Sequence, residues 1–280
     1  YLDLSRDIQS YAFYLQDEYR PLTNLTFTAG VRYDYYDTFG DTVNPRLACV
    51  YSPVRATTLK LLYGTAFRAP NAYEFFYDDD GQTSKMNPDL KPEKVNTYEV
   101  VCEQQLGRHW RGSVAGFWSS VRDLVSQAQD PVDGLYYPEN IDQADAHGVE
   151  LQLDGQLTRA IRGRASYTFT ETEDKASGDT LANSPEHLAK LNLTAPVFGD
   201  WLFAGGELQY MSERTTTADQ TLDDVWLVNA TLFASRLLDT WDISLSVYNL
   251  FNARYRDPAF NPDTVEQDGS TLRLKILGRF

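Results

Sequence analysis

Trp241-Asp242-Ile243-Ser244-Leu245-Ser246-Val247 and Thr271-Leu272-Arg273-Leu274-Lys275-Ile276 are the two stretches that decide the fold. In both, large apolar residues occupy every second position, and small, polar or charged residues lie between them. Successive side chains of a β-strand point to opposite faces, so this alternation predicts two strands that each have an apolar and a polar face. A soluble β-sandwich turns the polar face to bulk water, whereas a transmembrane β-barrel turns the apolar face to lipid and the polar face to a wet lumen.

The same alternation recurs back along the chain, and helical periodicity is nowhere persuasive. It appears in six further stretches, at residues 25–34, 59–64, 149–154, 161–170, 189–194 and 226–233. His109–Val125 alternates less regularly, and we expect it to be a strand whose facing is undefined. The count is about thirteen strands, each near the length needed to cross a bilayer at a tilt.

The connections between these strands are expected to alternate in length. Short ones are predicted near residues 21–24, 52–57, 107–109, 157–160, 196–200 and 238–240, and long ones near 37–43, 69–93, 129–147, 173–186, 212–224 and 253–269. Barrels of the bacterial outer membrane place short turns in the periplasm and long loops outside, whereas a sandwich has no reason to gather its long loops at one end. We therefore predict an all-β, antiparallel, up-and-down transmembrane β-barrel. An intact barrel has an even strand number, so the odd count leads us to expect at least one missing upstream strand.

Composition narrows the function classes. The 280 residues have a mean hydropathy of -0.44 and contain no run of about 18 apolar residues, which excludes a transmembrane helix but not a barrel. Aromatic residues make up 13%, which suits the aromatic girdles of a barrel. The net charge of -15 argues against nucleic-acid binding. The chain begins at Tyr1 with neither an initiator Met nor a signal peptide, so we expect it to be processed or a fragment.

The sequence offers no constellation for catalysis or metal binding. His109, His147 and His187 are isolated, and neither they nor Cys49 and Cys102 have the spacing of metal ligands. The two cysteines fall on the apolar phase of strands that are not direct neighbours, so we expect no disulfide. No histidine lies beside a nucleophile-like motif, and no G-x-S-x-G occurs. We therefore expect no cofactor, no bound metal and no enzymatic activity.

Three stretches resemble the TonB-dependent outer-membrane transporters. Tyr63-Gly64-Thr65-Ala66-Phe67-Arg68-Ala69-Pro70 is similar to the family's G-x-A-F-R-A-P strand end. Asn87-Pro88-Asp89-Leu90-Lys91-Pro92-Glu93, followed by Tyr98-Glu99, resembles its N-P-x-L-K-P-E…Y-E strand entry. Tyr248-Asn249-Leu250-Phe251-Asn252, with Tyr255 and a last strand closing on Phe280, resembles its C-terminal ending.

Two weaker echoes accompany these motifs. Tyr137-Pro138-Glu139-Asn140, leading to Gly148-Val149-Glu150-Leu151, is like the family's N…G-x-E-L strand, and Tyr11–Tyr36 is like a strand pair ending in G-x-R-Y-D. The prolines of the main motifs lack a backbone N–H and so mark where strand pairing stops. We therefore predict that residues 87–93 pin strand ends and register instead of contacting a ligand.

The resemblance implies a receptor that imports a scarce nutrient, most simply a ferric siderophore, with energy delivered by TonB. In the family a plug domain fills a barrel of about 22 strands. Nothing here resembles the plug, so residues 1–280 are expected to be the C-terminal portion of the barrel. Expected partners are outer-membrane lipid and lipopolysaccharide, the iron chelate, the TonB complex through a plug segment missing here, and the barrel assembly machinery through Phe280. Cobalamin or haem uptake, or a passive porin-like channel, are the alternatives.

Candidate substrate-binding residues lie in the expected long loops: Arg68, Tyr73, Phe75, Phe76, Tyr77, Tyr136 and Tyr137. Their rings suit stacking on a catecholate or another planar chelate, and equally suit packing against neighbouring loops. Asp78-Asp79-Asp80 suits either calcium or a solvated tip. The residues expected to face the lumen, and there to meet acidic plug residues or an anionic ligand, are Arg162, Arg164, Arg273, Lys275 and Arg279.

Overall fold

The computed structural model describes residues 7–158, 160–237, 240–259 and 263–278. Arg279 and Phe280 lie outside the described residues, as do Leu238 and Asp239 of the predicted turn at 238–240. Within the described residues, thirteen strands pair in chain order in an antiparallel sheet, which confirms the predicted all-β class and strand number. They are β1 (Ser10–Leu22), β2 (Leu25–Tyr36), β3 (Gly40–Val54), β4 (Thr57–Arg68), β5 (Glu93–Leu106), β6 (Trp110–Gln129), β7 (Tyr136–Gln156), β8 (Arg162–Asp174), β9 (His187–Phe198), β10 (Leu202–Met211), β13 (Val225–Leu237), β14 (Trp241–Tyr248) and β17 (Thr271–Gly278).

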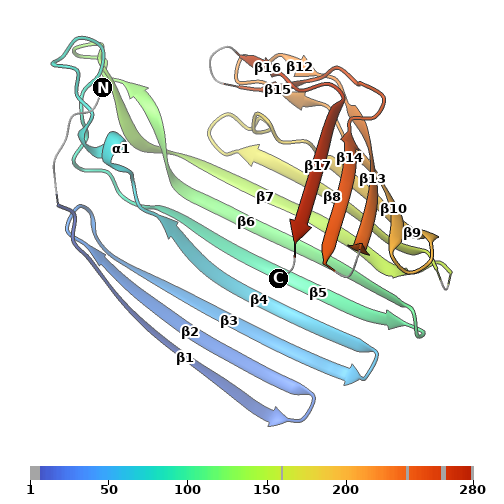
Figure 1. Ribbon diagram of the computed structural model, residues 1–280. Helices are drawn as coiled ribbons and strands as arrows, with labels where there is room; N and C mark the ends of the chain where they lie inside the picture. The colour runs from blue at the N-terminus through green and yellow to red at the C-terminus, as the bar shows by residue number, and fades with distance from the viewer. Residues whose placement is uncertain (1–6, 159, 238–239, 260–262, 279–280) are drawn as a thin grey trace. The chain divides into compact units, whose positions relative to one another are not determined.

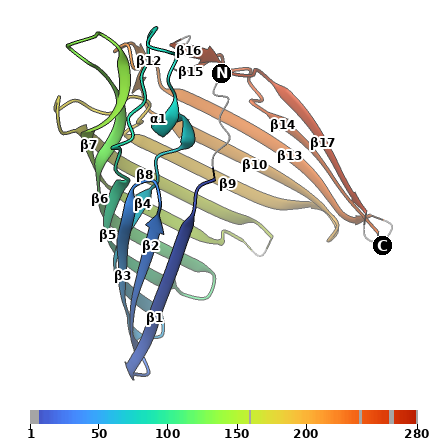
Figure 2. The same ribbon diagram turned by 90° about the vertical axis from the view of Figure 1, so that its left-hand side faces the viewer.

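The chain divides into two compact units. Unit 1 comprises residues 1–101, 117–147 and 172–180, and it holds β1 to β4 and helix α1 (Ala72–Phe76), which lies beyond the end of β4 (Figures 1 and 2). Unit 2 comprises residues 102–116, 148–171 and 181–280. Its long connections form two small sheets, β11 (Arg214–Thr215) with β12 (Thr221–Leu222) and β15 (Arg256–Pro258) with β16 (Thr264–Glu266). No helix in the described residues is long and apolar enough to span a membrane.

Unit 2 has one apolar and one polar sheet face, as the alternation predicts. Directly paired residues of an antiparallel sheet share a face, and Ala204, Leu232, Leu245 and Leu274 form one such row. The leucines of this row are exposed, Leu274 by 62%, whereas Ser246 and Asp242 of the opposite face are buried. A soluble protein distributes its residues the other way, with large apolar side chains inside. The distribution suits a sheet whose apolar face meets lipid, so the barrel and not the sandwich fits unit 2.

Unit 1 repeats this distribution. Phe27, Cys49 and Leu61 are register partners on one face, and Phe27 and Leu61 are exposed. On the other face Asp34 pairs with Thr42, and these residues are only 2% and 5% exposed. The apolar residues that are buried in the described part of the chain are few: Phe75, Leu90, Val101, Ala115, Ala144 and Val225.

Two of the connections predicted to be long are short turns. β2 ends at Tyr36 and β3 begins at Gly40, whose φ of 90° lets the chain reverse over residues 37–39. β6 continues to Gln129 and β7 begins at Tyr136, so the predicted loop at 129–147 is mostly strand. Pro138 and the polar residues around it gave that segment the composition of a loop, although it pairs as the extended arm of a hairpin. The prediction of a strict short–long alternation was therefore wrong at these two places.

We expect spin labels on the terminal strand to report its two faces. Labels at Leu272, Leu274 and Ile276 should be quenched by a lipid-soluble relaxation agent, because these side chains lie on the exposed apolar face. Labels at Arg273 and Lys275 should be quenched by a water-soluble agent. Power-saturation EPR on the protein in lipid vesicles measures both, and the opposite pattern would contradict the assignment of faces.

Candidate functional site: the loop ends of the strands

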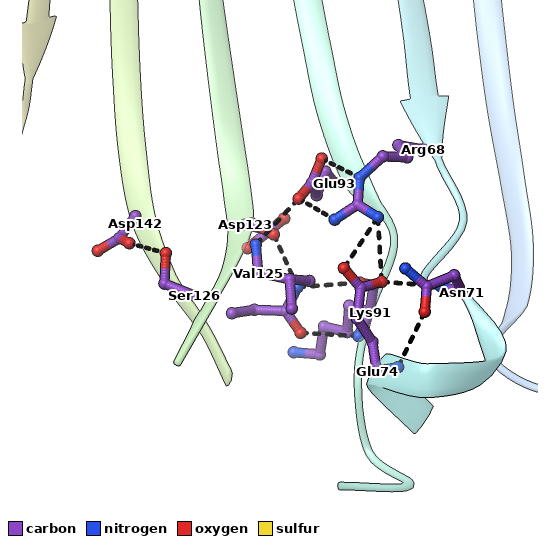
Figure 3. Close-up of polar contacts among 10 residues, drawn as sticks. Arg68, Asn71, Glu74, Lys91, Glu93, Asp123, Val125, Ser126 and Asp142 are labelled. Carbon is purple, nitrogen blue, oxygen red and sulfur yellow. Dashed lines mark hydrogen bonds and ion pairs between the residues drawn. The ribbon is translucent and has the colours of Figure 1, made fainter. Parts of the chain in front are cut away.

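Arg68, the last residue of β4, is held by two carboxylates at the end of unit 1 where the long connections lie (Figure 3). Its Nε donates to Glu93 Oε2 at 2.6 Å, and its Nη2 donates to the other oxygen of that carboxylate. Its Nη1 donates to both oxygens of Glu74, at 3.1 and 3.0 Å. A guanidinium and a carboxylate joined by two parallel hydrogen bonds make a strong and geometrically specific pair. Since Arg68 belongs to the first family-like motif and Glu93 to the second, the ion pair ties these motifs together.

Glu93 extends this tie to a third strand. Its side chain is nearly buried, and Oε1 also accepts the backbone N–H of Val125 in β6 at 3.0 Å. One carboxylate therefore connects the ends of β4, β5 and β6. A buried carboxylate is stable as an anion when paired and hydrogen-bonded in this way.

Helix α1 is oriented by the same network. The side chain of Asn71 accepts the backbone N–H of Glu74 at 3.0 Å, and the carboxylate of Glu74 accepts the backbone N–H of Asn71 at 2.7 Å. This reciprocal arrangement is a capping box, which satisfies N–H groups that the first turn of a helix leaves unpaired. Because Glu74 also accepts from Arg68, the helix start is fixed to the end of β4.

The aromatic residues of α1 and its C-cap Tyr77 divide into a buried anchor and a stacked pair of tyrosines, of which Tyr73 is exposed and Tyr77 half-buried. Phe75 is 2% exposed, so it anchors the helix and does not present a ring to a ligand in this structure. Tyr73 is 56% exposed and stacks on Tyr77, with 4.3 Å between ring centroids and 21° between ring planes. Phe76 is half-buried and packs 5.5 Å from Phe75, centroid to centroid. Tyr73 and Tyr77 form the aromatic platform of unit 1.

Asn140 in β7 joins the second family-like motif to two strands. Its Oδ1 accepts the backbone N–H of Lys91 at 2.8 Å, while its Nδ2 donates to the carbonyls of Lys91 and Asp123, at 2.9 and 2.7 Å. Nearby, Asn87 Nδ2 donates to the carbonyl of Pro138 at 2.8 Å. The predicted role of residues 87–93 in pinning strand ends is thereby confirmed.

Lys85 fastens the middle of this long connection to the β6–β7 hairpin. Its Nζ donates to Asp130, and to Asp133 Oδ2 at 2.8 Å, and it lies 5.4 Å from the centroid of the Tyr137 ring. The backbone adds two bonds: Lys85 N–H donates to Tyr136 O, and Tyr136 N–H donates to Thr83 O, each at 2.9 Å. We call Lys85, Asp130 and Asp133 the loop latch.

The loop latch is expected to hold from mildly acidic to mildly alkaline pH and to weaken with salt. The hydrogen bonds from Lys85 lower the pKa of Asp130 and Asp133, and those carboxylates raise the pKa of Lys85. Carboxylates with a lowered pKa stabilise the closed loop above the free-acid value of about 4, and this contribution is lost as the pH falls further. The pKa of Lys85 is raised in the closed loop, so the lysine stabilises that loop fully below its free pKa of about 10.4. This stabilisation is lost as the pH rises through the raised pKa.

Double electron–electron resonance between spin labels at Gln82 and Val132 measures the distance between the two loops that the loop latch joins. We expect one narrow distance distribution from pH 5 to pH 9, broadening below about pH 4 or in concentrated salt. Lys85→Met should broaden it at every pH. Lys91→Met is the matched control, because the Lys91 side chain has no ion-pair partner in the described residues of the same loop. Equal broadening by both substitutions would contradict the latch.

The aspartate triplet forms a turn. The carboxylate of Asp79 accepts the hydroxyl of Thr83 and the backbone N–H groups of Thr83, Ser84 and Gln82, which lowers the pKa of Asp79 to about 2. Its oxygens are thus engaged by the chain. Over the described residues, no group of three or more His, Cys, Asp or Glu is placed to hold a metal ion.

Arg214 joins three connections of unit 2. Its side chain is only 4% exposed. Its Nη1 donates to Asp257 Oδ1 at 2.9 Å and to Asn183 Oδ1 at 3.5 Å, and its Nη2 donates to the carbonyl of Arg256 at 3.1 Å. Its Nε is buried and has no hydrogen-bond partner among the described residues. The backbone N–H of Asn183 also donates to Thr215 O at 2.9 Å, so three segments distant in the chain meet at Arg214.

The cations predicted to face the lumen share one face of unit 2. Register partners across the sheet form the row Arg162, Thr194, Gly205, Thr231, Ser246 and Arg273, and Lys275 lies two residues along from Arg273. Arg162 and Arg164 line an open concavity of about 730 Å³ together with Asp154 and Glu207. Arg164 Nε donates to Asp154 Oδ1, so this polar face carries both signs of charge.

Several residues of the site were missed by sequence reasoning. The Asn71-x-x-Glu74 spacing is a readable capping-box signal, so the start of α1 was within reach of the sequence. Asn140 stood inside a quoted motif but had no predicted role. Lys85 and Arg214 carry no local signal, because their partners come from segments far away in the chain.

The comparisons with known proteins agree with the fold. The family model described as TonB dependent receptor-like, beta-barrel matches residues 1–250, and the chain belongs to this family, whose barrels lie in the bacterial outer membrane. It is 27% identical over 266 residues to the iron-regulated outer membrane virulence protein of Vibrio cholerae, covering 86% of this chain and 40% of that protein. It is 29% identical over 190 residues to a vitamin B12 transporter of Photobacterium profundum, covering 65% and 29%.

A solved structure shows the same fold. A mutant of the ferric enterobactin receptor of Pseudomonas aeruginosa superposes with a TM-score of 0.84 at 19% identity, covering 98% of this chain and 45% of that chain. The chain therefore spans less than half the length of the proteins it matches.

Proposed function

We propose that this chain serves in the uptake of a ferric siderophore across the outer membrane, by energy-coupled, TonB-dependent transport. The family match over residues 1–250 carries the proposal. The names of the iron-regulated relative and of the ferric enterobactin receptor support an iron chelate as the substrate. The proposal is transport and not catalysis, because the family and these similar proteins are receptors and transporters.

The aromatic platform supports the same class of substrate. Tyrosine rings stack on planar aromatic donors such as catecholates, so the exposed Tyr73 and its half-buried partner Tyr77 are the proposed ligand contacts. Phe76, Tyr136 and Tyr137 are further proposed contacts. Arg68 was a candidate contact as well. Its guanidinium is engaged by two carboxylates, so we propose that it orients α1 and the platform.

The remaining assignments concern the whole receptor. We propose that residues 1–280 are the C-terminal portion of its barrel. The TonB complex would act through a plug segment, the barrel assembly machinery would recognise Phe280, and lipid and lipopolysaccharide would surround the apolar face. The polar face with Arg162, Arg164, Arg273 and Lys275 would line the lumen, as would Arg279.

Growth of a strain deleted for the complete gene tests the function. We expect slow growth when a ferric siderophore is the sole iron source and normal growth on ferrous iron. Complementation should require a functional TonB. Normal growth of the deletion strain on every iron chelate, on haem and under cobalamin limitation would refute the uptake function.

Cobalamin or haem uptake by the same mechanism is the second candidate. The similarity to a vitamin B12 transporter over 65% of this chain favours cobalamin. A defect confined to cobalamin-limited or haem-limited medium would select one of these substrates. A passive porin-like channel would instead admit small solutes in a strain without TonB.

Removing a platform ring is expected to weaken ligand binding. Tyr73→Ala deletes the exposed ring of the stacked pair, and aromatic stacking of about 1–1.5 kcal/mol corresponds to roughly a five- to tenfold rise in Kd. Tyr73→Phe keeps the ring and should bind nearly as tightly as wild type. Fluorescence quenching of the purified protein by ferric enterobactin measures Kd, and equal affinities for the two variants would contradict the platform.

A further inference from the structure

A groove of about 370 Å³ lies on the apolar face of unit 2, near the short turns that join β5 to β6 and β7 to β8. Small residues form its floor, namely Cys102, Gly112 and Ala165. Leucines form its walls, and among them Leu106 is 49% and Leu151 41% exposed. The groove is therefore an open recess with hydrocarbon walls.

Gly112 places the recess on the outward face. A Cβ at this position would lie 3.7 Å from Leu106 Cδ1 and 3.8 Å from Leu153 Cδ1, which is ordinary van der Waals contact. The missing side chain of Gly112 thus leaves open space between two wall leucines. An alanine methyl at this position would therefore fit without forcing the backbone to move.

The recess is continuous with the rest of the apolar face. Ala165 on its floor pairs with Leu191, Leu191 pairs with Leu208, and Leu208 pairs with Val228. In an outer-membrane barrel this face meets lipid. If the recess were empty, the atoms that line it would lose van der Waals contacts. The hydrocarbon chains of the surrounding lipid are available to fill it.

The position of the recess along the strands indicates which leaflet of the outer membrane it faces. β5 ends at Leu106 and β6 begins at Trp110, so the recess lies at the short-turn end of the sheet. Short turns of these barrels face the periplasm, and the periplasmic leaflet of the outer membrane is built of phospholipids. The ring of Trp110 lies over Gly155, so that a Cβ there would clash with it, and tryptophan is enriched at the headgroup level of a bilayer.

The turn beside the recess carries an available cation. Arg108 lies two residues beyond Leu106, is exposed, and has no hydrogen-bond or ion-pair partner in the part of the chain that the structure describes. We propose that the recess seats one acyl chain of a periplasmic-leaflet phospholipid, whose phosphate pairs with Arg108. The barrel thereby holds a specific lipid at β5–β8.

Native mass spectrometry of the protein purified from outer membranes tests this proposal. After delipidation, the wild type titrated with phosphatidylglycerol should bind one molecule more tightly than the rest. Gly112→Leu fills the recess and should weaken that binding about tenfold, the equivalent of displacing roughly two methylene groups. Arg108→Gln should weaken it about fivefold, because only the headgroup contact is lost.

Gly206→Leu is the matched control. Gly206 lies on the same face, as the partner of Leu193 and Ala230, and no atom lies within 4 Å of its Cβ position. It should bind phosphatidylglycerol as the wild type does. Heat-modifiable migration in gels verifies folding, and Ala165→Leu replaces Gly112→Leu if the latter does not fold.

Two results would overturn the proposal. Equal phosphatidylglycerol binding by the recess-filling variant and Gly206→Leu would show that the recess is not the seat. Preferential retention of lipid A, or of detergent alone, by the wild type would assign the recess to another amphiphile.

Discussion

Arg214→Met is expected to loosen three connections of unit 2 together, while the strands beneath them stay intact. The substitution removes the donors to Asp257, Asn183 and the carbonyl of Arg256. Removing one partner of a buried ion pair costs about 3–5 kcal/mol. Asp257 is 37% exposed and regains water once the arginine is gone, so we expect about 2 kcal/mol, or roughly a 30-fold rise in loop opening.

Hydrogen exchange at the amides of β11, β12, β15 and β16 measures this opening. Arg256→Gln is the control, because Arg256 contributes only its backbone carbonyl to Arg214. Exchange in β13 and β14 should be unchanged in both variants. If Arg214→Met left the small sheets as protected as Arg256→Gln does, Arg214 would not be what holds these connections together.

Asn140→Ala is expected to free the end of the long connection in unit 1. It deletes three hydrogen bonds, of 2.8, 2.9 and 2.7 Å, and leaves the N–H of Lys91 without its partner. At about 1 kcal/mol for each bond, the loss is about 3 kcal/mol, or roughly a 150-fold faster exchange of the Lys91 amide. Asn140→Asp keeps the acceptor but turns a negative charge toward two carbonyl oxygens, so it should not rescue.

Asn87→Ala serves as a reference for the effect of Asn140→Ala. Asn87 donates one hydrogen bond to β7, to the carbonyl of Pro138, and accepts one from the exposed backbone N–H of Asp89, so its loss should cost about 1–2 kcal/mol. Hydrogen exchange on both variants gives the comparison. Similar effects of the two substitutions would mean that Asn140 does not have the central position that its three bonds imply.

The strands could be predicted from the sequence because their signal is local. Alternation in segments such as Leu272–Ile276 defines both the strand and its faces, and the register of β14 with β17 agrees with those faces. The lengths of the loops were harder to predict from the sequence. A glycine at position 40 permits a tight reversal, and Pro138 is tolerated within β7, but composition alone assigned both segments to loops.

The site was predictable in part. Residues 87–93 were correctly interpreted as pinning strand ends: β5 begins at Glu93, directly after Pro92, and Asn87 and Lys91 form hydrogen bonds with β7. The aromatic residues at 73–77 were also singled out, but not the difference between the buried Phe75 and the exposed Tyr73, because a five-residue helix has too few turns to show a periodicity. Arg214 could not be found, because its burial depends on connections that meet only in the folded chain.

The ties around Arg68, Glu93 and Asn140 have a consequence for which parts of this chain can be altered. Every one of them is made at the feet of the connection between β4 and β5, where it leaves and rejoins the sheet. Among the residues that the structure describes, the stretch Asp78–Gln82 in between forms hydrogen bonds only within its own turn and to Thr83 and Ser84. Substitutions within residues 78–82 therefore leave in place both the ties at the strand ends and the loop latch at Lys85. This tip is the part of the connection whose sequence can vary without loosening the strand ends.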